Sequence, residues 1–75
     1  MCLSEARVGN LLKIKSINIE NVKMRYYLMQ MGVIQDTYIQ LLKKTFFQGP
    51  IIILLRNYKL CLSLDIASKI MVEIV

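Results

Sequence analysis

Two apolar segments joined by a short turn restrict the fold of this chain more than any other feature. Residues 50–56 and 59–64 flank Asn57 and Tyr58, and both segments are rich in isoleucine and leucine. Side chains alternate between the two faces of a β-sheet, so pairing Arg56 with Lys59 places six aliphatic side chains on one face. These six are Ile51, Ile53, Leu55, Leu60, Leu62 and Leu64. The sequence therefore predicts a β-hairpin that covers a hydrophobic core.

The back of this hairpin is also partly apolar. In the same register it carries Ile52, Leu54 and Arg56 opposite Ser63, Cys61 and Lys59. The three apolar members make a larger area than a monomer of 75 residues usually exposes. The sequence leaves three alternatives for what covers this face: a helix of the chain itself, a second copy in a homodimer, or a partner protein.

One helix is predicted between residues 18 and 32. Asn18 is expected to cap its first turn, because an asparagine side chain accepts a hydrogen bond from an exposed N–H there. Gly32 is expected to end the helix in a left-handed conformation, with Val33 placed to contact Leu28. The apolar residues expected to recur along the core side are Val22, Met24, Tyr27, Leu28 and Met31.

The remaining segments predict three further strands. Residues 11–17 and 70–75 alternate in polarity, residues 37–44 form a strand after a turn, and residues 65–69 form one helical turn. No spacing suits a parallel crossover. The sequence therefore predicts one domain, residues 1–75, folded as a small and mostly antiparallel barrel of about five strands.

Composition restricts the class of protein. The longest apolar run, residues 51–55, is far shorter than the roughly 18–20 residues of a membrane helix. No signal peptide is evident at the N-terminus, so we expect a soluble, cytoplasmic chain without direct membrane insertion. Ten Lys and Arg residues against five Asp and Glu residues give a net charge of +5. The basic residues form no run longer than a pair, so we expect solvated faces rather than a nucleic-acid surface.

The residues that usually carry catalysis or bind metals are few. The chain has no histidine, its five carboxylates are dispersed, and its three glycines form no phosphate-binding loop. Cys2 and Cys61 alone do not complete a tetrahedral zinc site, and Cys61 in mid-strand is expected to act as a small apolar residue. We therefore expect no enzymatic activity, no cofactor and no tight ferrous-iron site.

Taken in order, several short motifs resemble the bacterial FeoA family, ferrous iron transport protein A. The resemblance covers residues 3–75, and the order and spacing of the motifs carry it more than any one of them does. The motifs are Leu3-Ser4-Glu5 with Gly9, the helix segment 25–33, Gly49-Pro50-Ile51 with residues 56–62, and Ala67 with Ile70 and Val72.

The chain also departs from the family pattern. The family usually has glycine where Asp36 and Asn57 stand, and these two residue types tolerate positive φ better than most. Tyr26 stands where the family has a helix arginine, and Ser63 stands where an arginine often ends the hairpin. The sequence of the loop 45–50 also differs from the usual loop sequence of the family. If those arginines contact a partner, the contact made by this chain is altered.

The resemblance implies an SH3-like barrel with helical additions and an accessory role in bacterial ferrous iron uptake. The implied partner is FeoB, a membrane permease with a cytoplasmic GTP-binding domain. Aromatic residues and arginine most often anchor interfaces, so the candidate partner-binding residues are Lys23, Arg25, Tyr26, Phe46 and Phe47. Transition-metal binding is implied at the family level only. The alternatives are a stand-alone SH3-like domain related to the C-terminal domain of metal-dependent repressors, and a small basic barrel that binds nucleic acid.

Overall fold

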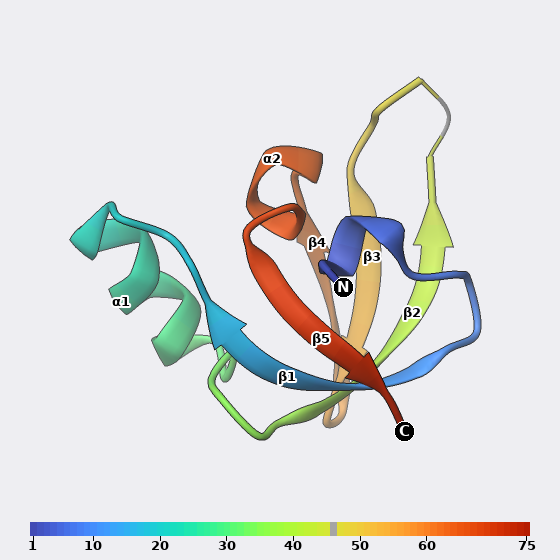
Figure 1. Ribbon diagram of the computed structural model, residues 1–75, viewed down its shortest axis with the longest axis horizontal. Helices are drawn as coiled ribbons and strands as arrows, with labels where there is room; N and C mark the ends of the chain where they lie inside the picture. Colours follow the sequence, from blue (N-terminus) through green and yellow to red (C-terminus); the bar gives the residue numbers. More distant parts are fainter. Residues whose placement is uncertain (46) are drawn as a thin grey trace.

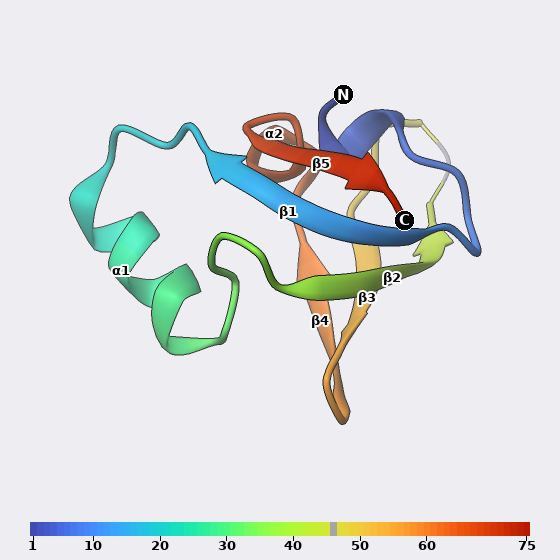
Figure 2. The same ribbon diagram turned by 60° about the horizontal axis from the view of Figure 1, so that its bottom comes forward.

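Five antiparallel strands form one sheet in the order β4-β3-β2-β1-β5 in the computed structural model, which describes residues 1–45 and 47–75 (Figure 1). The strands are β1 (Leu11–Ile17), β2 (Tyr38–Lys44), β3 (Ile51–Leu55), β4 (Tyr58–Leu62) and β5 (Ile70–Ile74). Three short helices accompany them: η1 (Leu3–Glu5), α1 (Val22–Gln30) and α2 (Leu64–Ala67). Figure 2 shows β1 and β5 crossing over the β3–β4 hairpin, so the sheet curls around its own apolar face. The predicted antiparallel barrel is confirmed.

Alternate side chains of every strand fill the inside of the barrel. Leu12 and Ile14 of β1, and Ile39 and Leu41 of β2, are almost completely buried. From outside the sheet, Leu3 of η1 and Leu28 of α1 close the core. No polar or charged residue is buried within the part of the chain that the structure describes. The period-two pattern of the strands therefore accounts for most of the core.

The hairpin keeps the predicted buried face but not the predicted register. Ile53 pairs with Leu60, and Leu55 with Tyr58, so Arg56 and Asn57 form the turn instead of Asn57 and Tyr58. A shift of two residues returns each side chain to the same face, which is why the aliphatic pattern could not distinguish the two registers. Five of the six expected core residues are buried, and Leu64 instead begins α2, partly buried at the edge of the core.

Helix α1 ends where the sequence predicts but begins later. Its cap is Asn21, whose side chain accepts a hydrogen bond from the Met24 backbone N–H at 3.0 Å, so the expected cap at Asn18 is wrong. Gly32 is left-handed (φ 93°), and the Val33 N–H donates to the Leu28 carbonyl at 2.8 Å. This is the predicted helix end, with a glycine just beyond the last helical residues.

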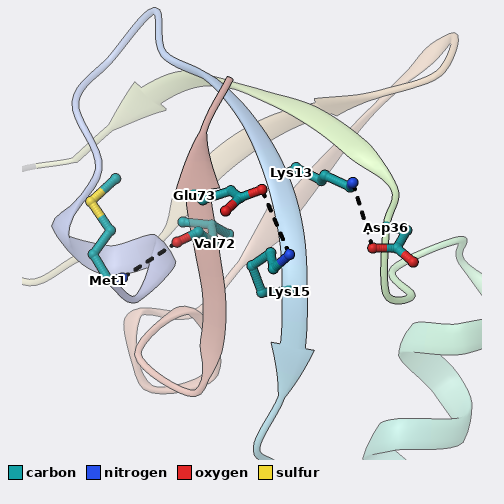
Figure 3. Close-up of polar contacts among 6 residues, drawn as sticks. All are labelled: Met1, Lys13, Lys15, Asp36, Val72 and Glu73. Carbon is teal, nitrogen blue, oxygen red and sulfur yellow. Dashed lines mark hydrogen bonds and ion pairs between the residues drawn. The ribbon is translucent and has the colours of Figure 1, made fainter.

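The N-terminal residues extend the sheet beyond β5. The Val72 N–H donates to the Met1 carbonyl at 2.8 Å, and the Met1 amino group donates back to the Val72 carbonyl at 3.3 Å (Figure 3). On β1, Lys15 lies 3.6 Å from Glu73 of β5, and Lys13 lies 3.8 Å from Asp36 in the segment before β2. These contacts hold both neighbours of β1 in place.

Membrane-spanning helices are absent from the described residues, because each of their helices is too short to cross a bilayer.

Candidate protein-binding surface

Helix α1 protrudes from the barrel. Figures 1 and 2 both place it at one end of the longest axis of the molecule, beyond the end of β1. Within its nine residues only Leu28 is buried, while Met24 and, just after the helix, Met31 pack against the core partly buried. The helix is therefore attached to the barrel along one narrow side.

The opposite side of α1 carries exposed apolar residues. Val22, Tyr26 and Met29 are four and three positions apart, so they lie on the same side of the helix. Their exposed fractions are 67%, 58% and 54%. We call these three residues the outer stripe of α1. The sequence pattern placed Val22 and Tyr27 toward the core, and both are in fact exposed.

A groove of about 460 Å³ adjoins the outer stripe. It lies between the end of β1, the helix and the segment that follows it. Its lining residues are Ser16, Ile17, Arg25, Met29, Val33, Ile34 and Gln35. Met29 belongs to both the stripe and the groove, so the two form one continuous apolar surface with Arg25 as its charged member.

Two basic side chains of α1 form no ion pair among the described residues. Ion pairs hold Lys13, Lys15 and Lys69, whereas the exposed Lys23 and Arg25 form none with any described residue. Unpaired cations beside an apolar surface attract partners that carry negative charge.

The predicted partner-binding residues divide into two groups. Lys23, Arg25 and Tyr26 all lie exposed on α1, as the sequence suggested. Phe47 is fully exposed in the loop between β2 and β3, with φ 58°, and Phe46 lies outside the described residues. Because this loop and α1 are at opposite ends of the longest axis (Figures 1 and 2), the two groups do not form one surface.

The back of the hairpin is not covered by α1. A Cβ atom added to Gly32 would lie 3.3 Å from Leu55 Cδ2, on the core side of the hairpin, so the end of the helix meets the opposite face. Ile52 and Leu54 are half-buried on the outside of the sheet, and Cys61 is exposed. Helix α1 is therefore excluded as the element that covers the back of the hairpin.

The carboxyl group of Glu5 takes part in a structural contact near the N-terminus. The pKa of the Glu5 carboxyl lies below its ordinary value because the Cys2 backbone N–H donates to it at 3.0 Å, and the Cys2 thiol donates at 3.2 Å. These two hydrogen bonds close η1, which is distant in the sequence from the outer stripe. Across residues 1–45 and 47–75, no group of three or more His, Cys, Asp or Glu side chains is placed to hold a metal ion.

Five antiparallel strands with short helices before β2 and β5 have the SH3-like fold. The FeoA domain family matches residues 1–74, and the chain belongs to that family. A comparison with curated proteins finds no match.

Solved structures agree with this family. The chain is 31% identical to a FeoA-like protein from Clostridium acetobutylicum, with a TM-score of 0.85, covering 100% of this chain and 86% of the other. It is 25% identical to FeoA from Chlorobium tepidum, with a TM-score of 0.91, covering 100% of this chain and 70% of the other. A manganese-dependent transcriptional repressor, 21% identical with a TM-score of 0.90, is covered over 41% of its length and shares the fold alone.

Membership of the family supports a role in ferrous iron transport. The family consists of small accessory domains, not enzymes, and is linked to the Feo transport system. The implied relationship to metal-dependent repressors is seen at the level of the SH3-like fold.

Proposed function

We propose that this chain is an accessory protein of bacterial ferrous iron uptake that binds the cytoplasmic part of a FeoB-like permease. The protruding helix α1 carries the proposal, because its exposed Lys23, Arg25 and Tyr26 belong to the residue types that anchor and steer interfaces. Membership of the FeoA family supports the assignment to ferrous iron transport, and the outer stripe supports the binding of a protein partner. The chain acts at the cytoplasmic face of the membrane, where the permease has its GTP-binding domain.

Charge reversal on α1 tests this proposal. The affinity of the full chain for the cytoplasmic domain of the permease from the same bacterium is measured by surface-based kinetics at low and high salt. Arg25→Glu should slow association and flatten its salt dependence, because an unpaired cation steers encounter more than it holds the complex. Arg7→Glu is the matched control, since Arg7 is also exposed, belongs to the segment between η1 and β1, and changes the net charge equally.

Phe47→Ala distinguishes the two groups of candidate residues. If the loop between β2 and β3 is the contact, this variant speeds dissociation while Arg25→Glu binds like the parent. If α1 is the contact, Phe47→Ala binds like the parent. An unmodified chain that fails to bind the permease domain even at low salt would contradict the proposed function.

A further inference from the structure

We infer that the outer stripe of α1 and the adjoining groove bind an amphipathic helix of the partner, one that presents apolar side chains together with carboxylates. The inference rests on the proposed function for the identity of the partner, but not for the chemistry of the contact. It assigns Val22, Tyr26 and Met29 as apolar anchors and Arg25 as the residue that selects for negative charge.

The outer stripe has no role in the core of this chain. Leu28, with Met24 and Met31, attaches α1 to the barrel, and the stripe lies on the other side of the helix. Single exposed apolar residues are ordinary on protein surfaces. Three in register that continue through Met29 into a groove form a contiguous patch, and such patches mark sites of interaction.

The shape of this surface suits a helix. Val22 and Met29 are separated by seven residues, which is roughly 10 Å along the helix axis. Two helices pack by placing side chains of one between those of the other, and peptide helices that lie in grooves use anchors with this same spacing. The groove beside Met29 and Ile34, at about 460 Å³, has room for large side chains from such a partner.

Charge selects the partner among the candidates. Arg25 is the only charged residue that lines the groove among the described residues, and Lys23 lies exposed on the same helix. A second copy of this chain, related by a two-fold axis, would bring these cations toward their own equivalents, which is unfavourable. A helix with carboxylates beside its apolar residues would instead pair with Arg25 and bury the stripe.

Site-specific photo-crosslinking in the source bacterium tests the inference. The photoreactive residue p-benzoylphenylalanine replaces Tyr26 in the full chain, and in a control it replaces Val8, which has the same exposed fraction of 58%. Val8 belongs to the segment between η1 and β1, at the opposite end of the molecule in Figures 1 and 2. The cross-linked peptides are then identified by mass spectrometry.

We expect a cross-link from position 26, and none from position 8, to a helix of the partner that contains both apolar and acidic residues. If that helix belongs to the permease, the proposed function is supported as well. If it belongs to another protein, the inference holds and the proposed partner is wrong. A cross-link to a second copy, to lipid, to nucleic acid or to a segment without carboxylates would overturn the inference, and so would the absence of a cross-link from position 26.

Substitutions within the stripe supply a second measurement on the cross-linked partner. Met29→Ser should weaken its affinity by roughly tenfold or more, since a buried anchor is lost. Val8→Ser, the matched control, should leave the affinity unchanged. Both variants should remain folded, with only a small loss of stability for Met29→Ser from the lower helix propensity of serine. Equal affinities for the two variants would contradict the assignment of the anchors.

Discussion

Arg56 has a left-handed backbone, with φ 56°, at the turn of the β3–β4 hairpin. That conformation costs most L-residues roughly 1–2 kcal/mol, because the Cβ atom approaches the following carbonyl oxygen. Glycine lacks a Cβ atom and is free of this cost. The turn of this hairpin therefore places an arginine in a conformation that glycine adopts more easily.

Replacing Arg56 by glycine should stabilise the protein. We expect Arg56→Gly to raise the free energy of unfolding by about 0.5–1 kcal/mol, the relief of strain less the greater entropy of glycine in the unfolded chain. Asn57→Gly is the control and should stabilise nothing, because Asn57 is not left-handed. Urea unfolding measures both. Stabilisation by Asn57→Gly alone would instead favour the turn at Asn57 and Tyr58.

Individual residues of the turns were predictable only in part. Asp36 is left-handed (φ 70°), as expected for a residue at a position where the family usually has glycine. The same expectation at Asn57 is wrong, because the hairpin register is shifted by two residues. Aliphatic alternation specifies a face and not a register, so the sequence left the choice of turn residue open.

Helix α1 has two asparagines that could cap it. The chain uses Asn21, whereas Asn18 lies in the connection between β1 and α1, where its backbone N–H donates to the Lys69 carbonyl at 2.7 Å. Ile19, in the same connection, is buried at the edge of the core. These tertiary contacts keep residues 18–20 outside the helix, and a single sequence does not reveal them.

Capping substitutions should separate the two asparagines. Asn21→Ala should lower the free energy of unfolding by about 1 kcal/mol, because the Met24 N–H loses its acceptor. Asn18→Ala, at an exposed position outside the helix, should change it by less than about 0.5 kcal/mol. Denaturation monitored by circular dichroism measures both variants. Equal losses would show that the helix begins earlier than Asn21.

The candidate protein-binding surface on α1 was also predictable only in part from the sequence. The sequence selected Lys23, Arg25 and Tyr26, and all three are exposed on α1. It missed Val22 and Met29, because an apolar residue in a helix is expected to face the core until the core side is known. The spacing of Val22, Tyr26 and Met29 was the available signal, and the burial of Leu28 on the other side gives it meaning.

The molecule as a whole depends on one continuous hydrophobic core. Seventeen apolar residues form it within the described part of the chain. A domain of this length has a free energy of unfolding of roughly 4–11 kcal/mol. Loss of one large core side chain is therefore a substantial fraction of the total stability.

Two adjacent isoleucines of β3 test the assignment of the barrel interior. Ile53 is completely buried, and Ile53→Ala should lower the free energy of unfolding by about 2–5 kcal/mol. Ile52 lies half-buried on the outer face, so Ile52→Ala should cost less than half as much, although the same atoms are removed. Chemical unfolding compares the pair. Similar losses would mean that the two faces of the hairpin are equally buried.

The pairing of β1 with β5 joins distant parts of the chain, since Ile14 pairs with Val72, roughly sixty residues later. During synthesis, β1 therefore leaves the ribosome long before its partner strand exists. Until then the nascent barrel has an open edge, and Leu12 and Ile14 lack part of their cover. Non-local pairing of this kind slows folding, and incomplete sheets with exposed edges are prone to association. The barrel consequently closes only after β5 has emerged from the ribosome.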